Sequence, residues 1–146
     1  SYMGENQYFQ GGSNIVTFQL NNISFSSFIC YDLRFPEVFQ AASKVANIIF
    51  VPANWPERRR QHWKCLLQAR AIENQVYIIA VNCVGEIGGI KYSGDSCVID
   101  PEGRVLVESS GREEVLEYEL LDNVEGFRNV FQMKNDRRED LYRSFL

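Results

Sequence analysis

One cysteine is placed where a reactive thiol could act. Cys30 ends the apolar run ISFSSFIC and directly precedes the polar sequence YDLR. Residues 23–30 predict a strand, and Pro36 predicts the start of a helix, because proline suits the first helical position. The carboxyl ends of strands are where α/β proteins bind ligands. A thiol held on such a turn also lies near backbone N–H groups that can stabilise an oxyanion. Cys30 is therefore a candidate nucleophile, and packing in the core is the alternative.

A nucleophilic thiol needs an activating partner, because its unperturbed pKa is about 8.5. The chain has one histidine, His62, inside the predicted amphipathic helix 56–75, where a surface or helix-packing role is favoured. A carboxylate or a lysine must then activate the thiol. The residue types alone do not choose among the candidates Glu5, Lys44, Glu57, Lys64, Glu73 and Lys91.

Trp55 is the second informative residue. It follows the predicted strand 47–53, so it lies at the same sheet edge as Cys30. An aromatic wall for a small substrate and a core tryptophan are both compatible with this position. One histidine and four scattered cysteines give no metal-ligand spacing, so no metal site is predicted. Packing roles are predicted for the other cysteines, which are Cys65, Cys83 and Cys97.

Strands and helices alternate along the chain, which predicts a layered α/β fold in one domain. Hydrophobic patterns predict strands at 15–20, 23–30, 47–53, 76–82 and 114–120, and a hairpin at 96–109 with its turn at 101–103. Helices are predicted at 36–46, 56–75 and 122–131, the last with Asp122 as its N-cap.

Composition excludes several classes of function. The 146 residues are 45% hydrophobic and carry a formal net charge of −4. This negative charge does not indicate binding to nucleic acid or to an anionic membrane, which would call for a basic surface. No apolar run approaches the roughly 20 residues of a membrane-spanning helix, and the first residues do not resemble a signal peptide. None of the four cysteines forms a CxxC pair, which favours free thiols in a reducing compartment. A cytoplasmic protein is expected.

Four stretches resemble the nitrilase, or carbon–nitrogen hydrolase, superfamily. ICYDLRFPE resembles its nucleophile motif, and residues 51–85 resemble its omega-amidase branch. Residues 92–106 and 135–142 match as well. The resemblance implies part of a four-layer αββα sandwich, with a mixed sheet flanked by helices. It also implies a Glu–Lys–Cys triad that cleaves amides through a cysteine thioester, no cofactor, and a homodimer.

The resemblance assigns roles to five residues of this chain. Cys30 takes the place of the nucleophile, and the N–H of Tyr31 belongs to the oxyanion hole. Glu5 takes the place of a second glutamate found near the active site of the family. Trp55 matches an aromatic position of the omega-amidase pocket. Arg34 matches an arginine that either contacts substrate or forms a structural ion pair.

The family's domain is nearly twice as long as this chain, and its triad glutamate and lysine lie upstream of Ser1. Residues 1–146 are therefore expected to be the C-terminal half of one domain, inactive alone and with apolar sheet surface exposed. The missing N-terminal half is an expected partner. The expected substrate is a small amide that carries a carboxylate and releases ammonia on hydrolysis. A non-catalytic binding or structural α/β domain, and a cysteine hydrolase of isochorismatase type, are the alternatives.

Overall fold

The computed structural model describes residues 4–121 and 123–143, without the side chain of Glu5. The strands are β1 (Thr17–Leu20), β2 (Ile23–Ser27), β3 (Ile48–Ala53), β4 (Tyr77–Asn82), β5 (Val84–Ile87), β6 (Ile90–Ser93), β7 (Cys97–Ile99) and β8 (Val105–Glu108). The α-helices are α1 (Pro36–Ala42), α2 (Arg60–Asn74), α3 (Val124–Val130) and α4 (Glu139–Tyr142). The 3₁₀ helices are η1 (Glu5–Gln7), η2 (Cys30–Arg34) and η3 (Glu57–Arg59). None of the helices in the described ranges is long and apolar enough to cross a membrane.

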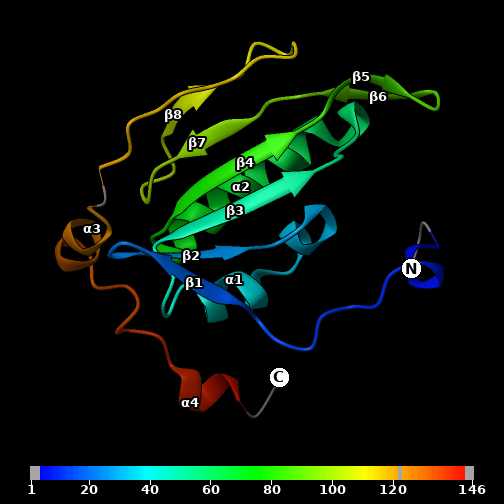
Figure 1. Ribbon diagram of the computed structural model, residues 1–146. Coiled ribbons are helices and arrows are strands. Elements are labelled where there is room, and N and C mark those ends of the chain that lie inside the picture. The colour runs from blue at the N-terminus through cyan, green and yellow to red at the C-terminus, as the bar shows by residue number, and fades with distance from the viewer. Residues whose placement is uncertain (1–3, 122, 144–146) are drawn as a thin grey trace.

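A six-stranded mixed sheet organises the chain (Figure 1). Its strand order is β1-β2-β3-β4-β7-β8. The central strands β2, β3 and β4 run parallel; β1 pairs antiparallel with β2, β7 pairs antiparallel with β4, and β8 pairs antiparallel with β7. A separate hairpin of β5 and β6 extends from the end of β4. The predicted α/β class is therefore confirmed.

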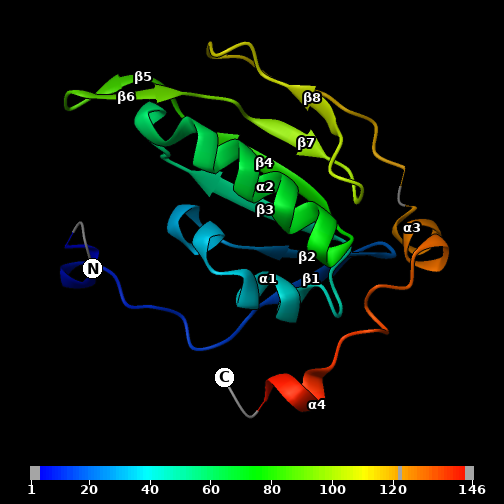
Figure 2. The same cartoon turned by 180° about the vertical axis from the view of Figure 1, so that it is seen from behind.

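Helices α1 and α2 cover one face of this sheet, as Figure 2 shows from the helix side. The apolar side chains of α2 recur at helical spacing, so Trp63, Leu67 and Ala71 all face the sheet and are fully buried. They pack with Ile49 and Val51 of β3 in the main hydrophobic core. The core thus lies between the two helices and the parallel strands, which fixes the strand ends relative to α2.

The opposite face of the sheet, which faces the viewer in Figure 1, is apolar and only partly covered. Phe18, Phe25 and Phe50 stack across three neighbouring strands, with ring centroids 5.4 and 5.6 Å apart. Phe18 remains 48% exposed and Val81 57% exposed, and α3 covers only one end through Val124. The exposed apolar sheet surface expected from the sequence is present, and we name it the open face.

One predicted element is absent from the described residues, and one observed element was not predicted. The predicted strand 114–120 is wrong: those residues form no strand, because their backbone pairs with no other strand in the described part of the chain. The hairpin of β5 and β6 was not predicted, although its Gly88–Gly89 turn has positive φ at both residues, as tight hairpins require. Helix α3 agrees with prediction, but the proposed cap Asp122 lies outside the described residues.

Candidate functional site

The carboxyl ends of β2, β3 and β4 meet at one edge of the sheet, because these strands run parallel. Cys30 lies three residues beyond the end of β2, Trp55 two residues beyond β3, and Asn82 is the last residue of β4. The structure therefore brings Cys30 and Trp55 to the same edge, as the sequence predicted. It adds Asn82, which the sequence analysis did not single out.

Cys30 has a strained backbone. Its φ is +47°, in the left-handed region that side chains other than glycine seldom adopt. The turn is fixed on its N-terminal side by Asp32, whose carboxylate accepts the N–H of Ile29 at 2.9 Å. Phe28 anchors the same segment to β3 by donating its N–H to the carbonyl of Phe50 at 3.0 Å. The predicted strand 23–30 thus ends at Ser27, and Cys30 opens η2 with its side chain partly buried against the main core.

Tyr31 follows in the first turn of η2, and its side chain is 58% exposed. The first N–H groups of a helix have no carbonyl partner within the helix. The backbone N–H of Tyr31 accordingly makes no hydrogen bond to another described residue. A donor of this kind next to a thiol is what stabilisation of an oxyanion requires.

Arg34 lies on an aromatic platform one turn after Cys30. Its guanidinium carbon is 4.7 Å from the ring centroid of Trp55 and 5.9 Å from that of Tyr31. Among the described residues, Arg34 has no carboxylate partner within ion-pair distance. The structural ion pair considered for Arg34 is therefore not found in the described part of the chain.

Trp55 is a core tryptophan that also forms the platform. Its side chain is 2% exposed and packs on Trp63 at 5.6 Å between ring centroids. The indole N–H donates to the carbonyl of Arg59 at 2.8 Å, which fixes the orientation of the ring. One alternative from the sequence, a buried core position, is thus observed, while contact with Arg34 keeps Trp55 beside the Cys30 turn.

Asp95 forms a buried ionic centre near the same edge, which sequence reasoning missed. Its carboxylate accepts two hydrogen bonds from Arg60, at 2.8 and 2.7 Å, one from Ser93 at 2.6 Å, and it pairs with Lys64 at 3.3 Å. Burial alone would raise the pKa of Asp95, but the contacts from Arg60, Ser93 and Lys64 hold it below its usual range. The centre ties the start of α2 to the segment between β6 and β7.

The candidate activating residues are spread over several elements, from η1 to β6. Three of the six are held in ion pairs: Lys44 with Glu139, Lys64 with Asp95 and Glu108, and Glu73 with Arg70. The side chain of Glu5 lies outside the described residues, although its backbone belongs to η1 in the exposed N-terminal segment. His62 is exposed on α2, in line with the surface role favoured from the sequence.

The other cysteines differ in environment. Burial raises the pKa of the Cys97 thiol to about 12, so it stays protonated and inert near neutral pH. Burial also raises the pKa of Cys83, and the proximity of Cys30 adds to the increase. Cys65 is exposed on α2. The packing role predicted for Cys97 is therefore confirmed, while Cys83 is a neighbour of Cys30.

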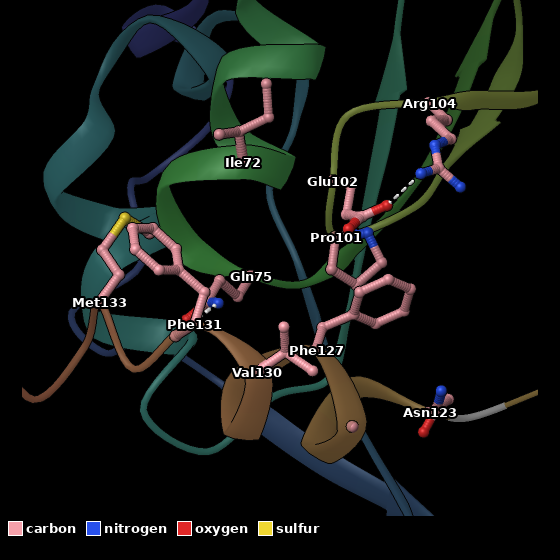
Figure 3. Close-up of a pocket in the computed structure, with 11 residues that line it drawn as sticks. Ile72, Gln75, Pro101, Glu102, Arg104, Asn123, Phe127, Val130, Phe131 and Met133 are labelled. Atoms are coloured by element: carbon pink, nitrogen blue, oxygen red, sulfur yellow. Dashed lines mark hydrogen bonds and ion pairs between the residues drawn. The ribbon is translucent and has the colours of Figure 1, made fainter.

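A cavity of about 670 Å³ lies at the other edge of the sheet (Figure 3). It is lined by the end of α2, the turn between β7 and β8, and α3 with the residues that follow it. Among the described residues that line it, the one buried side-chain atom without a hydrogen-bond partner is Gln75 Oε1, which is enclosed by protein and therefore offers no hydrogen bond to a ligand in the cavity. This cavity is separate from the Cys30 edge and is not the candidate site.

The comparisons with known proteins agree with this geometry. Residues 1–128 match the family described as carbon-nitrogen hydrolase, so the chain belongs to the carbon–nitrogen hydrolase family. The chain is 44% identical over 144 residues to 2-oxoglutaramate amidase of Bacillus subtilis (strain 168), a match that spans 96% of this chain and 55% of that protein. It is 37% identical over 110 residues to omega-amidase YafV of Escherichia coli (strain K12), spanning 75% of this chain and 43% of that protein.

Solved structures of carbon–nitrogen hydrolases also resemble this chain. XC1258 from Xanthomonas campestris, a CN-hydrolase superfamily protein, superimposes with a TM-score of 0.86 and 31% identity over 94% of this chain and 56% of that one. A glutamate-to-leucine mutant of the amidase from Nesterenkonia sp. AN1 superimposes with a TM-score of 0.83 and 28% identity over 97% of this chain and 52% of that one. That structure carries the acetamide moiety of fluoroacetamide on its active-site cysteine. The chain spans about half the length of the curated relatives it matches. The omega-amidase-like branch of the nitrilase superfamily is thereby identified, and the isochorismatase-type alternative is set aside.

The Asp95 centre generates a prediction about stability and pH. Asp95→Asn should lower the free energy of unfolding by about 1–3 kcal/mol at pH 7, because the buried site loses its charge-assisted hydrogen bonds. A lowered pKa in the folded state stabilises the protein above the unfolded pKa of about 3.9, and this stabilisation is lost as the pH falls through the lower, folded value. Urea unfolding from pH 7 to pH 3 should therefore show the difference between variant and parent shrinking with acid.

Asp140 provides the matched control, since it pairs with Arg138 on the surface. Asp140→Asn should leave the free energy of unfolding nearly unchanged, because exposed ion pairs contribute little. A deficit in Asp95→Asn that stays constant down to pH 3 would contradict the electrostatic account.

Proposed function

We propose that the full-length protein containing this chain is a cysteine amidase that hydrolyses the terminal amide of a small, carboxylate-bearing substrate and releases ammonia. One observation carries the proposal: the strained turn at Cys30 lies beside a guanidinium, Arg34, held on the ring of Trp55 and without a carboxylate partner among the described residues. The names of the relatives, 2-oxoglutaramate amidase and omega-amidase, support amides of this type as the substrate class.

The chemistry proceeds in two steps. The Cys30 sulfur attacks the amide carbon, and the N–H of Tyr31 donates to the oxygen that becomes negative. The C–N bond breaks, the nitrogen takes a proton and leaves as ammonia, and a thioester remains on Cys30. Water then attacks the thioester carbon, giving the carboxylic acid and restoring the thiol. No cofactor is needed for either step.

Arg34 supplies the preference for a carboxylate in this proposal. A guanidinium binds a carboxylate through two parallel N–H donors, and stacking on Trp55 keeps it oriented without using those donors. The substrate carboxylate would lie over the aromatic platform while its amide reaches Cys30. Trp55 would then affect substrate binding by orienting Arg34 more than by touching the substrate, because its side chain is only 2% exposed.

The proton transfers require a base and an acid positioned beside Cys30. We propose that the triad glutamate and lysine come from a part of the protein outside these 146 residues, with Glu5 as the additional glutamate. The open face supports this proposal, since a second sheet packed there would bury the Phe18, Phe25 and Phe50 stack. On this proposal the 146-residue polypeptide alone is inactive, and it functions as the C-terminal half of one domain in a cytoplasmic homodimer.

Replacement of Cys30 tests the nucleophile. Cys30→Ser in the full-length protein should lower ammonia release from an omega-amide by about a thousandfold or more, because the hydroxyl lacks the acidity and nucleophilicity of the thiol. The fold should survive this nearly isosteric change, which circular dichroism can check. Cys65→Ser, at an exposed position on α2, is the control and should keep the rate within about twofold of the parent. Parental activity in Cys30→Ser would rule out the mechanism.

Replacement of Arg34 tests the substrate class separately. Arg34→Met should lower kcat/KM for the carboxylate-bearing amide by roughly 10- to 100-fold, the value of a charge-assisted hydrogen-bonded pair. The same amide without its carboxylate should be hydrolysed within about threefold of the parental kcat/KM. Arg58→Met, in η3 and with no carboxylate partner in the described residues, should affect neither substrate. An equal loss for both substrates would show that Arg34 does not recognise the carboxylate.

A further inference from the structure

We propose that Asn82 is a positioning residue for carboxylate recognition: its side-chain amide holds the backbone of Trp55, and through Trp55 it holds Arg34. This inference rests on the proposed function, since it concerns how the same site selects its substrate. Asn82 does not reach the reacting atoms in this account. It acts through two intermediate side chains, each placed by a contact in the structure.

All observed hydrogen bonds of the Asn82 side-chain amide are made to backbone groups. Its Oδ1 accepts the N–H of Trp55 at 2.7 Å, and its Nδ2 donates to the carbonyl of Trp55 at 3.2 Å. Nδ2 also donates to the carbonyl of Gly94 at 2.9 Å. Both backbone groups of Trp55 are therefore bound by one side chain, which is only 6% exposed. Such a two-point contact fixes the position and the direction of the Trp55 backbone.

Asn82 is itself held in place by Ser96. The backbone N–H of Asn82 donates to Ser96 Oγ at 2.9 Å, and that hydroxyl donates to the carbonyl of Asn82 at 3.3 Å. Asn82 also pairs with Ala53 in the register of β3 and β4. The amide thus projects from a fixed strand end toward the loop that follows β3. A rigid support of this kind is what a precise binding site needs around it.

The position of Trp55 decides where Arg34 lies. The loop after β3 leaves the sheet at Ala53 and is next bridged at Pro56, opposite Tyr92, so the Trp55 backbone itself makes no strand pairing in the described part of the chain. The Asn82 amide replaces that pairing, and the Trp55 ring then presents its face to Arg34 at 4.7 Å. Loss of the amide donors would leave two carbonyl groups unpaired in a buried region, which is costly. The loop would move to pair them, and Arg34 would move with it.

Asn82→Asp is the sharpest variant, because it keeps the size of the side chain and the acceptor for the Trp55 N–H. It replaces the two donated hydrogen bonds by an oxygen that faces two carbonyl oxygens. In the full-length protein we expect the preference for the carboxylate-bearing amide over the same amide without the carboxylate to fall at least tenfold. The loss should lie in KM more than in kcat, since Cys30 is held by a separate segment.

A double variant separates positioning from general damage. In an Arg34→Met background, Asn82→Asp should change the preference by less than about twofold, because the group that Asn82 positions is already gone. Asn74→Ala is the matched control, since Asn74 is a fully buried asparagine on α2 that binds the Arg70 carbonyl away from this edge. It should lower stability but leave the preference intact. An unchanged preference in Asn82→Asp, or additive effects with Arg34→Met, would overturn the inference while leaving the amidase function standing.

A second measurement does not depend on activity. The full-length protein labelled with fluorotryptophan gives a ¹⁹F resonance for Trp55, assigned by its loss in Trp55→Phe. Asn82→Asp should shift or broaden this resonance, whereas Asn74→Ala should leave it in place. If the parent shows no amidase activity, the proposed function fails on its own. An unshifted Trp55 resonance would overturn the positioning role of Asn82 in either case.

Discussion

Parallel pairing of β2, β3 and β4 is the constraint on which the candidate site depends. Parallel strands end at the same edge, so the segments that follow them become neighbours although they are far apart in the sequence. The pairing places the turn at Cys30, the loop at Trp55 and the amide of Asn82 together. Helix α2 maintains this arrangement, because its buried face packs on β3 while its first turns bind Asp95 beyond β6.

The two faces of the sheet have different consequences for function. The face under α1 and α2 forms a closed core, which supports the strain of the left-handed backbone at Cys30. The open face carries the stack of Phe18, Phe25 and Phe50, an apolar surface of the kind that mediates association. The site lies at an edge shared by both faces. A second layer on the open face would therefore also lie next to the Cys30 edge.

Much of the fold could be predicted from the sequence because the signals are local. The Asn21–Asn22 turn, with Asn21 at φ +54°, and the turn that ends at Gly103, with φ +83°, are properties of single residues. The buried runs that became β3 and β4 are equally plain in the sequence. Residues 114–120 show what local signals cannot predict. Their alternating pattern indicates that a strand there would be amphipathic, but it does not indicate whether a partner strand is present.

The candidate site was predictable only in part, because some of its residues lack a local signal in the sequence. Cys30 and Trp55 were identifiable because each follows an apolar run, which is a local signal. Asn82 and Asp95 were missed because their roles come from contacts with residues 27 and 35 positions earlier in the chain. The pairing of Arg34 with Trp55 likewise spans two strands and leaves no pattern in the sequence.

The most direct test of the account is detection of the acyl group on Cys30. The full-length protein would be mixed with a carboxylate-bearing amide, quenched in acid during turnover, and digested for peptide mass spectrometry. The account predicts an added acyl mass on the peptide that contains Cys30, removed by hydroxylamine as thioesters are, and its absence in Cys30→Ser. Ammonia release with no acyl group on Cys30, or with the acyl group on Cys83 or Cys65 instead, would contradict the central claim.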